Sequence, residues 1–365
     1  MSTFKCEVLS ISIEAHPDPE ALSIELACIG GYRSVVRKGA FKNGDLVAYL
    51  PEAAVLPDSL LEELGLTGKL KGAARNRIGA IKLRGQLSQG ICYPAKPEWV
   101  LGQDVQEELG IKKWEPEVPV ALQGEMNVCP GVRLRFDLEN IKKFPNLIAA
   151  GEEVIITEKL HGTCGVFGDI GIKNRHPEMF EGRYWVSTKN AANGALGPTG
   201  MFFKDNERNQ KNLYVRMFRD NKIAESLAAI RENLELEENE DLWILGEIFG
   251  KGIQDLQYGL QKPELRIFAM KIGEKWLSLE VVNALCSLCG LTLVPLLYQG
   301  PFCQEILESH TNGRESASGT AAHTREGVVV TLVKEGYSSD IEHGRIALKS
   351  ISADYLLRKN GTEFT

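Results

Sequence analysis

The side chain of Lys159 has the clearest chemical potential in this chain. It follows a run rich in β-branched residues, Val154 to Thr157, and Gly162 stands three positions after it. Such a run predicts a β-strand, so the lysine would lie at a strand end. Lysine amines become nucleophilic when nearby positive charge or burial favours their neutral form. An amine placed in this way could attack the α-phosphorus of a nucleoside triphosphate.

Two carboxylates further along the chain lie among apolar residues. Glu247 stands between Leu245 and Phe249, and Glu326 directly precedes the run Gly327 to Val330. An unpaired carboxylate on a buried strand is costly, so each needs a partner or a function. Hard divalent cations take oxygen ligands, and we expect these two residues to hold one, directly or through water. A buried ion pair without function remains the alternative.

Further residues could serve a bound nucleotide. Lys349 could neutralise charge at the α-phosphate in the transition state. Lys189 could help with the phosphates, or it could be an ordinary surface lysine. Phe268 could stack on the base or belong to the core. Gly162 and Gly327 would let the backbone approach the nucleotide closely.

The charge distribution points to a local phosphate site. The chain has 365 residues, which suggests two domains, and a net charge of −7, which argues against indiscriminate polyanion binding. Residues 65–97 nevertheless contain no acidic residue. We call the basic residues of this stretch the basic island: Lys69, Lys71, Arg75, Arg77, Lys82, Arg84 and Lys96. It indicates phosphate binding, although a solvated loop face would have the same composition.

Composition also bears on location. The eight cysteines are scattered, and reduced thiols in the cytoplasm are the simplest interpretation. Cys286 and Cys289 form one CxxC without a partner pair, in surroundings that read as a buried helix. No secretory signal and no apolar stretch of membrane-spanning length is visible, so we expect no membrane association.

The segments around Lys159, Glu247, Phe268, Glu326 and Lys349 together resemble those of the ATP-dependent RNA ligases of the covalent nucleotidyltransferase superfamily. The likeness is greatest to the Deinococcus type, which carries an N-terminal OB-fold module ahead of the ligase domain. It extends to the strings 15–18, 38–45 and 82–90, and so covers nearly the whole chain. A histidine often stands at the place of His161 in RNA ligases, whereas DNA ligases and capping enzymes more often have aspartate there.

The resemblance implies an α+β fold in three parts. Residues 1–100 read as short strands with glycine turns, which suggests a small OB-like barrel that binds nucleic acid. Residues 101–125 are expected to be a linker. Residues 126–365 would form the adenylyltransferase domain, an ATP-grasp-like ligase domain of antiparallel sheets with flanking helices.

The resemblance also implies a set of site residues. The expected catalytic residues are Lys159, Glu247, Glu326 and Lys349, with the metal on Glu247 and Glu326. The expected ATP contacts are Glu158, Leu160, Gly162, Lys189, Phe268 and Arg345. The chain departs from related ligases at Cys164, where phage-type relatives usually have asparagine, and at Ala347, where some have a second basic residue.

The function that follows is ATP-dependent joining of RNA ends. Lys159 would take AMP from ATP, pass it to a 5′-phosphate end, and a 3′-hydroxyl would then displace it, with Mg²⁺ or Mn²⁺ as cofactor. We expect a monomer that acts in RNA repair on RNA with 5′-phosphate and 3′-hydroxyl ends; nicked duplexes, tRNA breaks and free single strands are all open as its form. The alternatives are a DNA ligase, a GTP-dependent capping-type guanylyltransferase, or a nucleic-acid-binding protein with an inert transferase domain. In the first two an OB domain follows the last motif, whereas here about 16 residues follow Lys349.

Overall fold

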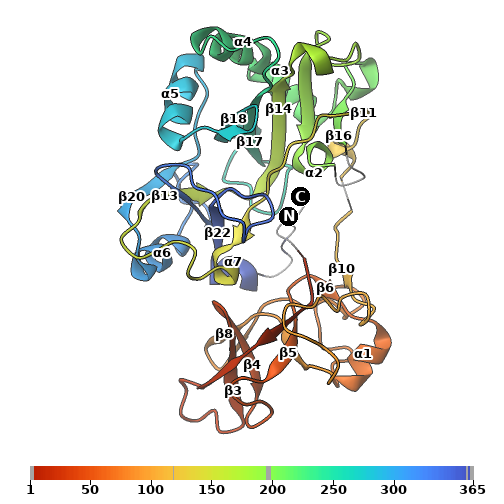
Figure 1. Cartoon of the computed structure of the whole chain (residues 1–365), viewed down its shortest axis with the longest axis vertical. Coiled ribbons are helices and arrows are strands. Elements are labelled where there is room, and N and C mark those ends of the chain that lie inside the picture. Colours follow the sequence, from red (N-terminus) through yellow and green to blue (C-terminus); the bar gives the residue numbers. More distant parts are fainter. Residues whose placement is uncertain (1–3, 118, 195–198, 359–360, 362–365) are drawn as a thin grey trace.

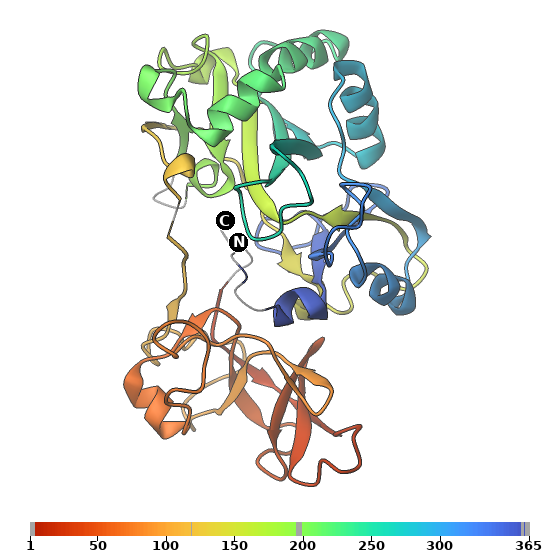
Figure 2. The ribbon, with the colours of Figure 1, turned by 180° about the vertical axis from the view of Figure 1, so that it is seen from behind.

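The computed structural model describes residues 4–117, 119–194, 199–358 and 361. Figure 1 shows two lobes: a smaller one formed by the N-terminal residues, and a larger one formed by the rest of the chain. The segment from β10 (Lys112–Lys113) to β11 (Met126–Cys129) runs between them, and the view from behind in Figure 2 shows the same separation. Among the described residues, no helix is both long and apolar enough to cross a membrane.

The small lobe is built mainly from antiparallel strands. One sheet contains β1 (Glu7–Ser10), β5 (Leu46–Leu50) and β9 (Ile91–Pro94), and another contains β2 (Ser12–Ala15), β3 (Ile24–Ile29) and β4 (Tyr32–Arg37). Shorter pairs are β6 (Ala54–Val55) with β10 (Lys112–Lys113), and β7 (Ile81–Leu83) with β8 (Gln86–Ser88); the helix of this lobe is α1 (Asp58–Glu63). Ile11, Ala27 and Val47 pack together in one core, and Leu60 and Leu61 of α1 close a second.

The larger lobe contains two five-stranded sheets. The first has the order β12 (Glu139–Asn140), β22 (Ala347–Ile351), β21 (Gly327–Leu332), β13 (Glu153–Lys159) and β20 (Leu296–Pro301). The second has the order β15 (Tyr184–Thr188), β14 (Gly162–Asp169), β17 (Leu242–Gly250), β18 (Pro263–Ile272) and β19 (Lys275–Trp276). Neighbouring strands are antiparallel except β12 and β22, which are parallel. A further pair joins β11 (Met126–Cys129) to β16 (Gly200–Phe203).

Helices flank these sheets. They are α2 (Lys189–Ala192), α3 (Leu213–Asp220), α4 (Ile223–Asn233), α5 (Leu279–Cys289), α6 (Gln304–Thr311) and α7 (Ala353–Leu357). Residues of α3, α4 and α5 pack on the second sheet, and Leu307 of α6 packs in the core of the first sheet. The CxxC pair lies on α5, as its surroundings predict, with Cys286 buried in this core.

The chain crosses from one sheet to the other at the predicted nucleophile. Lys159 is the last residue of β13, and Gly162 is the first of β14. Only Leu160 and His161 separate the two strands. Val154, Ile155 and Ile156 are buried in β13, which explains why this β-branched run forms a strand. Lys159 is therefore fixed between the two sheets.

The predicted linker contributes to both lobes. Val105 and Ile111 are buried in the core of the small lobe, and Trp114 N donates to Ala53 O. Leu122, by contrast, packs in the core of the larger lobe. We therefore propose an N-terminal unit that extends to about Trp114. The Gly/Asn-rich composition of 190–200 predicts a loop, but its first residues belong to α2, and residues 195–198 lie outside the described part of the chain.

Candidate active site

Lys159 is paired with one of the two predicted carboxylates. Its Nζ lies 2.7 Å from Glu326 Oε1, because β13 and β21 pair in a register that sets Lys159 opposite Gly327. The Glu326 carboxylate is buried, which opposes its ionisation, but the Lys159 ammonium and the His161 ring lower its pKa to about 2. This pair joins two residues that are far apart in sequence, where two interior strands of the first sheet end and begin.

The second carboxylate comes from the other sheet. Glu247 is in β17, opposite Cys164 of β14. Burial and the charge of Glu326 raise its pKa to about 7, although Lys159 favours ionisation. Lys159 thus lies within the electrostatic reach of two carboxylates, one from each sheet, and its ammonium compensates only Glu326 well.

The two carboxylates suit a divalent cation. Glu326 Oε2 is buried and has no hydrogen-bond partner among the described residues, and the repulsion between Glu247 and Glu326 would be relieved by a shared positive charge. No group of three or more His, Cys, Asp or Glu side chains in the described part of the chain is placed to bind a metal. The arrangement fits Mg²⁺ or Mn²⁺ held by a few protein oxygens, with phosphate and water completing the shell.

Two predicted lysines meet at a residue that the sequence analysis missed. Lys189 Nζ lies 3.2 Å from Asp137 Oδ1. Asp137 is buried, yet Lys189 and Lys349 keep its pKa below the usual range. Asp137 stands in the string Val132 to Asn140 between apolar neighbours, and that placement was the available sign of a buried partner.

The remaining predicted ATP contacts differ in their surroundings. Leu160 is buried beside Phe249 and Tyr258. Phe268 stacks on Phe136 with ring centroids 5.7 Å apart, and both line the cleft around Lys159. Arg345 also lines this cleft, but its guanidinium pairs with Glu335 at 2.7 Å and lies over the Trp276 ring.

Glu158 faces away from the Lys159 pair. Ser316 donates to its carboxylate through the backbone N–H at 2.8 Å and through the hydroxyl, and Arg325 lies 3.7 Å from it. Burial raises the pKa of Glu158. Alternate residues of a strand point to opposite faces, so Glu158 and Lys159 serve different surroundings although they are neighbours.

The structure shows why glycine is needed at positions 162 and 327, and the reason differs from the one expected from the sequence. A Cβ on Gly162 would meet the carbonyl oxygen of Ile248, and one on Gly327 would meet that of Ser350. Both glycines therefore allow neighbouring strands to approach closely. This tight packing brings β17 up to β14 and β22 up to β21, the strands on either side of the nucleophile.

The site opens into a cleft between the two lobes. The cleft has a volume of about 1540 Å³ and is lined by Lys159, Glu247, Glu326 and Lys349 from the larger lobe. From the small lobe it is lined by part of the basic island: Lys71, Arg75, Arg77 and Lys82. The remaining members have other contacts: Lys69 donates to Gly65 O, Arg84 pairs with Asp18, and Lys96 pairs with Glu108.

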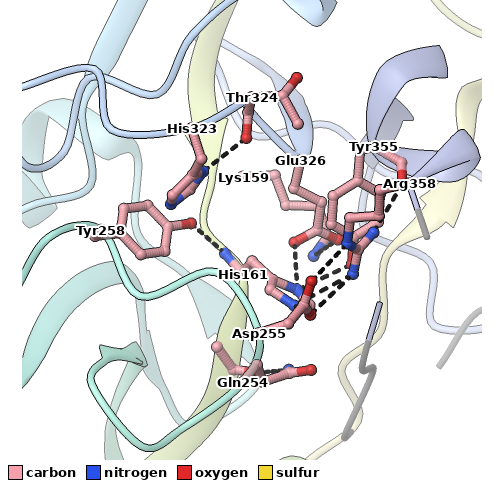
Figure 3. Close-up of polar contacts among 11 residues, drawn as sticks. Lys159, His161, Gln254, Asp255, Tyr258, His323, Thr324, Glu326, Tyr355 and Arg358 are labelled. Carbon is pink, nitrogen blue, oxygen red and sulfur yellow. Dashed lines mark hydrogen bonds and ion pairs between the residues drawn. The ribbon is translucent and has the colours of Figure 1, made fainter. Parts of the chain in front are cut away.

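The ring of His161 lies next to Glu326, the carboxylate that pairs with Lys159. Figure 3 shows its ring among Glu326, Asp255, Tyr355 and Arg358. The ring is buried, and its Nδ1 lies 3.7 Å from Glu326 Oε2. None of Asp255, Tyr355 and Arg358 was assigned a role from the sequence.

Comparison with known proteins identifies relatives for both lobes. A family model described as RNA ligase matches residues 152–351, a range that contains every predicted site residue. A model described as an OB-fold domain matches residues 9–95. The expected α+β fold, with an OB-fold module ahead of a ligase domain, is confirmed. A search of curated proteins found no match.

Solved structures of a Naegleria gruberi RNA ligase share the fold of nearly the whole chain. A lysine-to-alanine variant with ATP and Mn is 22% identical, with a TM-score of 0.74 over 96% of this chain and 97% of that one. The enzyme with PPi is 23% identical, with a TM-score of 0.75 over 97% and 98%. A lysine-to-methionine variant with AMP and Mn is 22% identical, with a TM-score of 0.73 over 96% and 97%.

Proposed function

Because this chain belongs to the RNA ligase family, we propose that it joins RNA ends through an AMP carried on Lys159. In the first step a bond forms between Lys159 Nζ and the α-phosphorus of ATP, the bond to pyrophosphate breaks, and the amine loses its proton. In the second step an oxygen of a 5′-phosphate end attacks the phosphorus of this AMP, the bond to Lys159 Nζ breaks, and the amine regains a proton. In the third a 3′-hydroxyl attacks that phosphate, and AMP leaves.

The observation that carries this proposal is the Lys159–Glu326 pair within the shared cleft. At 2.7 Å the carboxylate holds the amine at a fixed place but also favours its protonated form. Glu326 Oε1 therefore sets where the amine lies before it becomes the nucleophile. The same cleft is lined by Lys189 and Lys349, which would neutralise the triphosphate.

Solved ligases of the same fold carry ATP, AMP and Mn, and this supports the same cofactors here. Mg²⁺ or Mn²⁺ held by Glu247 and Glu326 would offset the triphosphate charge and polarise the α-phosphate. Phe268 and Phe136 would line the base, with Leu160 beneath the nucleotide. Glu158 and Arg345 remain proposed contacts, because both line the cleft while their side chains bind Ser316 and Glu335.

The small lobe would hold the RNA. Arg75 and Lys82 are exposed, and they face the cleft that contains Lys159. OB-fold surfaces with positive charge bind single strands along their backbone. We propose RNA with 5′-phosphate and 3′-hydroxyl ends as the substrate, including nicked duplexes, and RNA repair as the role.

The protein is proposed to act as a monomer in the cytoplasm. The cleft is completed by the two lobes of one chain, which supports a monomer. All eight cysteines lie in the described part of the chain, and each is a free thiol, as a reducing compartment would keep it.

The decisive experiment measures covalent labelling. The full chain is incubated with ATP or GTP labelled at the α-phosphate, with Mg²⁺ or Mn²⁺, and is then denatured. We expect acid-labile label from ATP and not from GTP, none in Lys159→Met, and joining of RNA ends by the wild type. Label from GTP alone would instead support a capping-type enzyme. Joining of DNA in preference to RNA would support a DNA ligase, and absence of label would support an inert binding module.

A further inference from the structure

The loop after β17 makes three polar contacts with the segment that follows Lys159. The Gln254 side-chain amide donates to Gly162 O, and Asp255 Oδ1 lies 2.9 Å from His161 Nε2. The backbone N–H of His161 donates to the Tyr258 hydroxyl at 2.7 Å. Three contacts from one short stretch thus fix the backbone and the ring of the segment between the two sheets.

Helix α7 holds the other side of the same ring. The Tyr355 hydroxyl lies 2.9 Å from His161 Nδ1. Arg358 Nε donates to Asp255 Oδ2 at 2.9 Å, and its guanidinium lies 3.5 Å from the centre of the Tyr355 ring. Figure 3 shows these side chains converging from the loop, from α7 and from the nucleophile strand. Both ring nitrogens therefore have partners, from two different segments, and the imidazole has one orientation.

This orientation matters because of what the ring touches next. His161 Nδ1 lies 3.7 Å from Glu326 Oε2, while Glu326 Oε1 lies 2.7 Å from Lys159 Nζ. Glu326 Oε2 makes no hydrogen bond to any described residue, so the neighbouring ring defines the space that this oxygen can occupy. The position of the ring then sets the direction in which Oε1 presents itself to the amine.

We propose that Asp255 and Tyr355 are positioning residues, which act through His161 to hold Glu326 and Lys159 in the geometry for adenylate formation. Arg358 supports them by holding the Asp255 carboxylate. The inference rests on the proposed function, since it concerns the rate of lysyl-AMP formation. Contacts that orient a group next to the reacting one typically change activity by about 10- to 100-fold, and small displacements of reacting atoms have comparable effects.

The test uses the full chain and times lysyl-AMP formation in a single turnover over a series of ATP concentrations. Asp255→Ala should lower the rate at saturating ATP by roughly 10- to 100-fold, and Tyr355→Phe by about 10-fold. The ATP concentration for half-maximal rate should change by no more than about twofold, because neither side chain binds ATP in this proposal. Asp354→Ala is the matched control, since Asp354 is exposed on the same helix.

Two further measurements distinguish positioning from general stability. In a His161→Ala background, Asp255→Ala and Tyr355→Phe should have no additional effect on the rate, because they act through the ring. Should His161→Ala be too slow to time, Asp255→Asn decides: it keeps an oxygen within reach of Nε2 and should retain most of the rate that Asp255→Ala loses.

Several results would overturn the inference. One is that Asp255→Ala and Tyr355→Phe form lysyl-AMP as fast as Asp354→Ala, and another is that they change the half-saturating ATP concentration instead of the maximal rate. The same holds if they still lower the rate in the His161→Ala background, or if Asp255→Asn loses as much rate as Asp255→Ala. A wild-type protein that takes no label from ATP would instead contradict the proposed function. Normal labelling in the wild type and in every variant contradicts only the positioning role.

Discussion

The two walls of the cleft use charge in different ways. On the wall of the larger lobe, half-buried lysines are tied to buried carboxylates: Lys159 to Glu326 at 2.7 Å, and Lys189 to Asp137 at 3.2 Å. On the wall of the small lobe, Arg75 and Lys82 are exposed, in a stretch of one sign only. Buried pairs depend on exact distances, whereas exposed charges act through a screened field that tolerates displacement.

The difference has consequences for mutation. A buried group that loses its partner leaves an uncompensated charge, so single substitutions on the larger wall should have large and specific effects. Exposed cations contribute in small, salt-dependent steps. The comparison therefore predicts a steep hierarchy of effects, and the following experiments can contradict it at each level.

The largest effect is expected at the nucleophile. Lys159→Met should abolish label transfer from ATP, because it removes the amine at the end of β13. ATP binding should persist, since Lys189, Lys349 and the metal carboxylates remain. The measurement is covalent labelling beside equilibrium binding of ATP. A variant that still becomes labelled would place the nucleophile elsewhere.

The metal carboxylates should come next. Glu247→Ala and Glu326→Ala should each slow adenylation by about 10² or more, as expected for charge contacts made in the transition state. The measurement is the single-turnover rate as a function of Mg²⁺ and Mn²⁺ concentration. Glu280→Ala is the control, because this carboxylate is exposed on α5 and lies outside the cleft lining. Near-normal rates with unchanged metal dependence in both test variants would contradict the assignment.

Removal of the small lobe should separate the chemical steps. A truncated chain that begins near residue 120 should still form lysyl-AMP, because all the predicted adenylation residues lie beyond residue 150. It should join RNA roughly tenfold less well or worse, since several phosphate contacts are lost. Circular dichroism checks that it is folded. If the truncated chain seals RNA as well as the full chain, the small lobe has another task.

A smaller effect is expected from single cations of the basic island. Arg75→Gln and Lys82→Gln should each weaken RNA binding and reduce the slope of log affinity against log salt by about one unit. Arg84→Gln and Lys96→Gln are matched controls, because these side chains pair with Asp18 and Glu108 outside the cleft lining. Equal changes in all four variants would show that only total charge matters.

The smallest effect should come from the contact between the lobes. Lys142 donates to the Gln89 side chain, and its carbonyl accepts from Gly31 N at 2.7 Å. Lys142→Ala removes one charged hydrogen bond, worth about 1.5–3 kcal/mol, and should increase protease cleavage within 115–125 while leaving adenylation unchanged. Lys143→Ala is the control. Unchanged cleavage in Lys142→Ala would mean that this side chain does not hold the lobes together.

Local sequence patterns predicted most of the elements. The sequence patterns of 223–234, 279–288 and 353–358 predict helices, which are α4, α5 and α7, and those of 242–248 and 327–332 predict strands, which are β17 and β21. These patterns are readable because apolar periodicity and β-branched runs act over a few residues. The same is true of the nucleophile, which carries its strand and its glycine within nine residues.

The packing of segments that are distant in sequence, in contrast, decided which partner each charged side chain has. Nothing near Lys189 in sequence points to Asp137, and nothing near His161 points to Tyr355, 194 residues away. Lys82 and Arg84 are basic residues two positions apart in the same acid-free stretch, yet of the two only Lys82 lines the cleft.

The sequence by itself determined which chemical groups are present and on which local elements they lie, because those properties depend on neighbours in the chain. The tertiary structure decided which groups meet. Lys159 contacts Glu326 because β13 pairs with β21. It interacts electrostatically with Glu247 because the chain continues from β13 directly into β14 of the second sheet. Gly162 and Gly327 belong to this second kind of information: the carbonyls of Ile248 and Ser350 explain them, and those contacts exist only once the strands are packed.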